Sequence, residues 1–144
     1  MLEGLVHLHS LLRWIVLILL VWTMIDAFAK RESKTAKFLT ISAHTMLLLG
    51  LIQWFIGEYG LKAIKELGMG ELMKLTTQRF YTIEHPLMMI IGIVFITIGG
   101  SWLKQGKSGA KWMYLAALLV ILSRIPWPFM EHVGRSLIPG VSGC

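Results

Sequence analysis

Four long runs of apolar residues dominate the chain, and short polar segments separate them. The runs cover about residues 5–29, 38–57, 81–103 and 112–130. A membrane's hydrocarbon core is about 30 Å thick, so a helix needs about 20 mostly apolar residues to cross it. None of the runs alternates apolar and polar positions, which excludes barrel strands and favours helices. The pattern therefore predicts an all-α fold: one membrane domain over 1–144, an up-down-up-down four-helix bundle with an irregular tail at 131–144.

Composition supports a membrane protein and excludes several function classes. Apolar residues make up 56% of the chain and charged residues 15%, well below the about 25% charge of soluble domains. The net charge of +6 is thus no sign of nucleic-acid binding. With Cys144 as the single cysteine, one chain cannot build a disulfide framework, a cysteine-rich zinc site or an iron–sulfur cluster. The sequence also has no hydrolase motif and no C-x-x-C-H for covalent haem attachment.

Loop charge predicts the orientation. The loops at 30–37 and 104–111 carry seven basic residues, whereas the longer second loop and the tail carry five. The positive-inside rule places the two basic loops in the cytoplasm and both termini outside it. The second loop, about 58–79, interleaves leucines with charged residues, which predicts a short interfacial helix interrupted at Gly68 and Gly70.

Small residues recur on two of the predicted helices. In a bilayer they allow close backbone approach, which stabilises helix packing. We therefore expect helix-packing seams at Ala43, Gly50, Gly57, Gly92, Gly99 and Gly100.

Ionisable residues inside a span are functional candidates because burying them in lipid is costly. Depth follows from counting residues from the basic cytoplasmic end of each span. His9 is 21 residues away, His85 is 19 and His132 is 21, so all three are expected in one layer near the outer boundary. His44 is 7 residues from its basic end, which puts it roughly 18–20 Å closer to the cytoplasm.

The pairing that this layer suggests is His9 with His85, as axial ligands of a non-covalent b-type haem. Arg13 lies four residues after His9 on the same helical face, within reach of a haem propionate. Arg124, somewhat deeper in the fourth span, is a second candidate for that contact. His44 is the reserve ligand.

Other interpretations compete with a haem site. Arg13 and Glu84 form a structural ion pair in one of them. In another, His85 stands at a helix start on the surface, because Pro86 disfavours helix before it and is suited to the first helical position. His7 and His132 are expected to contact headgroups or water.

Four sequence blocks resemble a known family. The blocks are VHLHSLLRWIVLILL (6–20), ISAHTMLLLGLIQWF (41–55), IEHPLMMIIGIVFITIGGS (83–101) and RIPWPF (124–129). They are similar to those of small four-span bacterial membrane proteins commonly called cytochrome B. The resemblance implies haem-linked electron transfer in the bacterial cytoplasmic membrane. The fourth span departs from cytochrome b-like carriers, since it has Arg124 and a Pro-Trp-Pro turn but no mid-membrane histidine.

The sequence is compatible with two functions of different classes. The first is a b-type cytochrome, or cytochrome subunit, that exchanges electrons with a quinone or a redox partner protein. The second is a haem-free accessory or assembly subunit of a membrane complex, whose ionic residues join helices. A solute or proton carrier is disfavoured, because no inverted repeat or broken mid-membrane helix is visible. Homo- and hetero-oligomers are both compatible with the sequence.

Overall fold

The computed structural model describes residues 2–135 and 137, and throughout these residues the chain is helical or forms turns, with no strand. The elements are α1 (Leu2–Phe28), α2 (Thr35–Ile56), α3 (Leu61–Leu72), α4 (Thr76–Arg79), the π-helix η1 (Phe80–Glu84), α5 (His85–Lys104) and α6 (Ala110–Ser123). The predicted all-α class is confirmed.

Three helical stretches are long and apolar enough to cross a membrane. They are α1, α2 and the continuous run Thr76–Lys104 that joins α4, η1 and α5. The fourth predicted span, 112–130, is helical only as far as Ser123. Pro126 and Pro128 explain this early end, because proline offers no backbone N–H and disfavours helical geometry in the residue before it. The predicted span 112–130 is therefore too long for a single helix: residues 124–130 are turns and bends, and α6 is a 14-residue apolar helix that ends before the two prolines.

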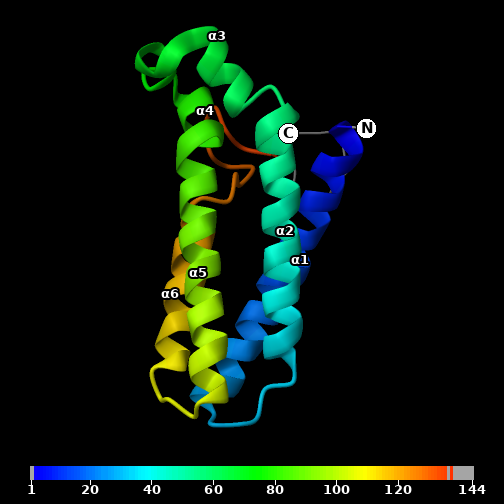
Figure 1. The fold of residues 1–144 in the computed structure, drawn as a ribbon, viewed down its shortest axis with the longest axis vertical. Coiled ribbons are helices and arrows are strands. Elements are labelled where there is room, and N and C mark those ends of the chain that lie inside the picture. The colour runs from blue at the N-terminus through cyan, green and yellow to red at the C-terminus, as the bar shows by residue number, and fades with distance from the viewer. Residues whose placement is uncertain (1, 136, 138–144) are drawn as a thin grey trace.

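The long helices form two adjacent pairs. α1 packs along α2 and α5 packs along α6, while α2–α5 and α1–α6 contacts join the pairs. Figure 1 shows the α1–α2 and α5–α6 connections at one end and α3 across the other. The two basic loops thus lie at the same end of the molecule.

Small residues bring α5 and α6 close together, as the sequence predicted. A Cβ at Gly92 would lie 2.6 Å from the Ile121 Cγ1, and one at Gly99 would lie 3.2 Å from the Tyr114 ring. Tyr114 and Ile96 are fully buried beside this seam. Large apolar side chains such as Ile18 and Leu119 instead point outward, with exposed fractions of 59% and 60%. Such a surface suits lipid and would be costly in water.

The second loop contains the helix that its sequence predicts. α3 carries a break at Gly68, whose φ of 75° is a left-handed value that glycine adopts easily. Ala63 and Leu72 are buried against the bundle, whereas Leu67 and Met69 are exposed. An apolar exposed side on a helix at the end of the bundle is typical of an interfacial helix.

Substituting Gly92 by alanine tests the α5–α6 seam. The added methyl group must push Ile121 aside, so we expect Gly92→Ala to lower stability in detergent by about 1–3 kcal/mol. Gly70→Ala is the matched control, because no heavy atom lies within 4 Å of a Cβ there. Thermal unfolding followed by circular dichroism measures both. An unchanged midpoint for Gly92→Ala would show that the seam is not tightly packed.

Candidate functional site

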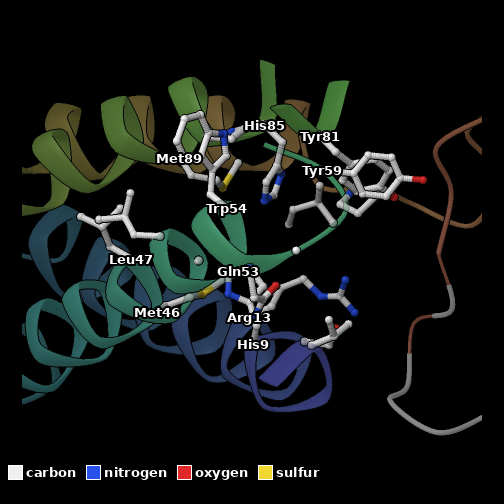
Figure 2. Close-up of a pocket in the computed structure, with 18 of the residues that line it drawn as sticks. His9, Arg13, Met46, Leu47, Gln53, Trp54, Tyr59, Tyr81, His85 and Met89 are labelled. Carbon is white, nitrogen blue, oxygen red and sulfur yellow. The ribbon is translucent and has the colours of Figure 1, made fainter. Parts of the chain in front are cut away.

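A cavity of about 280 Å³ lies inside the bundle, in the half nearer α3. Helices α1, α2, α5 and α6 contribute its walls, and most of the lining is apolar, including Met46, Leu47, Met89 and Ile93. His9 enters from α1 and His85 from the start of α5. Figure 2 shows the two imidazoles approaching from opposite walls, and their ring centres are 6.3 Å apart. The structure thus brings together the two histidines that residue counting placed at one depth.

A backbone hydrogen bond fixes the His85 ring. Its Nδ1 lies 2.6 Å from the carbonyl oxygen of Arg124. A carbonyl can only accept, so Nδ1 carries the proton and donates it. In the neutral ring the lone pair is then on Nε2, and the ring reaches into the cavity (Figure 2). Metal-binding histidines are commonly oriented by a bond of this kind from their other nitrogen.

The His9 ring rests on the backbone of α2 at Gly50. A Cβ at Gly50 would lie 3.3 Å from the His9 Cε1, so a larger residue would press on the imidazole. The Nδ1 of His9 is buried and has no hydrogen-bond partner among residues 2–135 and 137. Buried polar atoms are nearly always satisfied. His9 thus places an imidazole among apolar side chains of the cavity, with its Nδ1 buried against α2 at Gly50.

Pro86 shapes the segment that carries His85. Proline cannot donate to the carbonyl four residues before it, so the Thr82 oxygen has no such helical partner. Trp54 of α2 supplies the missing donor, with its Nε1 2.9 Å from that oxygen. The Thr82 hydroxyl in turn accepts a bond from the Gly60 N–H at 3.1 Å. These contacts hold the π-helical turn η1, a feature often found at functional sites.

The expectation that His85 begins a helix on the surface was therefore wrong. Helical structure starts nine residues earlier, at Thr76 in α4, and continues through η1 into α5. His85 itself has helical backbone angles, with φ −62° and ψ −52°. The π-helical turn accommodates Pro86 without ending the helix, so the imidazole lies inside the bundle.

Arg13 is buried, with 7% of its surface exposed, and lines the cavity. Its Nη2 donates to the Leu137 carbonyl at 2.8 Å, while its Nε has no partner in the described part of the chain. The alternative ion pair with Glu84 was wrong. Glu84 instead contacts Arg79 at 2.8 Å and Arg124 at 3.5 Å.

Residues 124–135 fold back onto the bundle, and Ile125, Pro126 and Arg135 line the cavity. Ile125 and Val133 are buried in this segment, so the described part of the predicted tail packs on the bundle although it is irregular. Arg135 donates from its Nε to the Tyr81 hydroxyl at 3.0 Å, and its guanidinium carbon lies 4.6 Å from the centre of the Tyr81 ring. The Tyr81 hydroxyl donates to the Val133 carbonyl, and Tyr59 stacks on the Tyr81 ring at 4.8 Å. Cys144 lies outside the described residues.

The remaining candidates lie away from the cavity. The His44 ring is exposed on α2, and its Nδ1 donates to the Thr40 carbonyl at 2.8 Å. The Arg124 guanidinium turns toward Glu84, so only its backbone serves the site, through His85. His7 and His132 are exposed.

Sequence reasoning missed Arg135, Tyr81 and Tyr59 as lining residues. Arg135 falls in a segment that reads as an irregular tail, and no periodicity links it to the helices. The two tyrosines gave a weak signal, since aromatic residues near span ends are also expected as interfacial anchors. The fold of the C-terminal segment is what joins these three residues.

The donor set of the cavity is a pair of imidazoles. Within the part of the chain that the structure describes, no cluster of three or more His, Cys, Asp or Glu side chains could hold a metal ion by itself. In comparisons with known proteins, no family model, no curated protein and no solved structure matches this chain.

A double-mutant cycle tests how Pro86 and Trp54 support the site. Trp54→Phe leaves the Thr82 carbonyl without a donor, so we expect a loss of about 1–3 kcal/mol in stability. In a Pro86→Ala background the new backbone N–H can serve that carbonyl, so the same tryptophan substitution should cost clearly less. Denaturant unfolding in detergent of the four proteins gives the coupling energy. Strict additivity would show that the two residues do not share the Thr82 oxygen.

Proposed function

We propose that the protein is a membrane b-type cytochrome, or a cytochrome-like subunit, in electron transfer, with haem held between His9 and His85. The observation that carries the proposal is the separation of the two imidazoles inside an apolar cavity. A first-row metal bonds an imidazole nitrogen at about 2 Å, so two imidazoles on opposite sides of one metal have ring centres about 6 Å apart. The 6.3 Å between His9 and His85 fits that arrangement.

The surroundings of each ring support the same assignment. The Arg124 carbonyl leaves the His85 Nε2 free to act as a ligand. The absence of a side chain at Gly50 leaves room for the His9 ring beside α2. Apolar neighbours such as Met46 and Met89 exclude water from the ligand nitrogens. Axial ligand, hydrogen bonding and burial are the means by which proteins tune haem.

The cavity volume of about 280 Å³ lies just below the about 300 Å³ at which small-molecule pockets begin. A flat macrocycle therefore requires residues 124–135 to shift outward, because moving the α1–α2 and α5–α6 pairs apart would change the 6.3 Å between the His9 and His85 rings.

Bound haem would supply one-electron chemistry. The chain would supply two axial nitrogens, a dry environment and cationic groups at the cavity mouth. A quinone or a redox partner protein would exchange the electrons. This role needs no acid–base pair from the chain. Glu58 is the one carboxylate among the lining residues.

The proposal includes a four-span arrangement in the bacterial cytoplasmic membrane. α6 would cross most of the bilayer, and residues 124–130 would complete the fourth span. Both basic loops lie at one end of the bundle (Figure 1), which is the arrangement that the positive-inside rule requires. The cavity is then in the outer half of the membrane, and α3 lies on the outer surface.

Haem occupancy of histidine variants tests the function. We expect His9→Ala and His85→Ala to abolish or sharply lower the haem-to-protein ratio, because each removes an axial ligand. His7→Ala, His44→Ala and His132→Ala should keep it, since their rings lie away from the cavity. Each variant is purified from one haem-sufficient host, and its reduced-minus-oxidised visible spectrum is recorded.

Three outcomes would contradict the assignment. A colourless wild-type protein would favour the haem-free accessory subunit. Normal haem in both His9→Ala and His85→Ala would remove the pair as ligands. Loss on His44→Ala alone would move the site to the cytoplasmic half of the bundle.

Cysteine labelling tests the orientation. In a Cys144→Ser background, Ser33→Cys and Ser108→Cys should resist a membrane-impermeant maleimide added to intact spheroplasts. Glu66→Cys on α3 should react, because we place that helix on the outer face. The reverse pattern would invert the topology while leaving the haem site unaffected.

A further inference from the structure

Two arginines line the cavity without a carboxylate partner among the described residues. Arg13 is 7% exposed, and its only hydrogen bond there is to the Leu137 carbonyl. Arg135 donates to the Tyr81 hydroxyl. Each guanidinium offers five N–H donors, so most of this capacity is unused. A buried cation without a counter-charge is costly.

The carboxylates nearby are already engaged elsewhere. Glu58 lines the cavity but contacts Lys62 at 2.8 Å, and Glu84 contacts Arg79 at 2.8 Å. Neither is paired with Arg13 or Arg135. The cavity lining therefore has two arginines without an ion-pair partner in residues 2–135 and 137, while its carboxylate, Glu58, is paired with Lys62.

The arginines occupy one end of the cavity relative to the histidines. Arg13 stands one helical turn from His9 on α1, and Figure 2 shows its guanidinium directed toward the side where Tyr59 and Tyr81 lie. Arg135 covers the Tyr81 ring on that same side. A ligand held by the imidazoles would thus meet both guanidinium groups at its edge. The planar guanidinium group matches a carboxylate with two parallel hydrogen bonds.

We propose that Arg13 and Arg135 form an anion-binding mouth that recognises the carboxylates of the ligand held by His9 and His85. This inference rests on the proposed function, and it assigns the propionate groups of haem to these two side chains. Arg135 comes from the C-terminal segment, so the segment that orients His85 also contributes to anion recognition. Arg124 does not take part, because its side chain turns toward Glu84.

Haem and haem dimethyl ester distinguish this proposal from simple haem binding. The ester keeps the ring, the iron and the axial sites but has no carboxylate charge. Apoprotein from a haem-deficient host is titrated in detergent with each compound, and the Soret band gives the two affinities. Wild-type protein should prefer haem by about tenfold or more, as expected for charge-assisted hydrogen bonds.

Matched variants assign the preference to residues. Arg13→Gln should reduce the ratio of the two affinities toward one, and Arg135→Gln should reduce it less, since exposed charges contribute less than buried ones. Arg135→Lys should retain part of the preference. Arg124→Gln removes a charge from the same segment and should keep the wild-type ratio. Comparing ratios cancels the different partition of the two compounds into detergent.

Each outcome separates the two proposals. Equal affinities in the wild type, or a ratio that Arg13→Gln and Arg135→Gln both leave unchanged, would overturn the anion-binding mouth while haem binding stands. If neither compound gives a ligated-haem spectrum, the proposed function fails and the mouth fails with it. An equal effect of Arg124→Gln would show a general charge effect and would also overturn the proposal.

Discussion

The missing N–H of Pro86 is the constraint on which the site depends. Within a bilayer a free backbone carbonyl has no water to bind, so the Thr82 oxygen needs another donor. Trp54 provides it from α2, which ties the first helix pair to the second. The helix forms the π-helical turn η1 directly before His85 and Pro86. Pro86 therefore affects both the contact of α2 with the α4–η1–α5 run and the position of the His85 ring.

Backbone carbonyls of the C-terminal segment after α6 likewise accept hydrogen bonds from side chains. Pro126 and Pro128 stop the helix at Ser123, which leaves backbone carbonyls without helical partners. The Arg124 carbonyl accepts from His85, and the Leu137 carbonyl accepts from Arg13 and Trp14. Side chains of the cavity thus complete the hydrogen bonding of an irregular segment. Because the contacts run both ways, packing of the segment and orientation of the cavity side chains are coupled.

Sequence reasoning recovered the features that depend on one helix at a time. Apolar length identified the three longest helices, residue counting placed His9 and His85 at one level, and small residues marked the Gly92 seam. It failed where the outcome depends on rotation about a helix axis or on tertiary contacts. Glu84 contacts Arg79, five residues before it on the same continuous helical run, rather than Arg13 on α1. The π-helical turn and the path of residues 124–135 depend on hydrogen bonds between distant segments, so no local sequence pattern predicts them.

The glycines contact different kinds of neighbour, which explains why a cavity lies between well-packed helices. Gly92 and Gly99 bring α5 and α6 close together: a methyl group would clash with Ile121 at Gly92 and would press on Tyr114 at Gly99. Gly50 meets an imidazole instead of a neighbouring backbone, so the space it creates is filled by a side chain that lines the cavity. Lipid does not drive apolar side chains together, hence nothing forces the two pairs to collapse onto each other. Hydrogen bonds from Trp54 to Thr82 and from Arg13 to Leu137 join the α1–α2 pair to the α5–α6 half of the bundle, and the cavity lies between them.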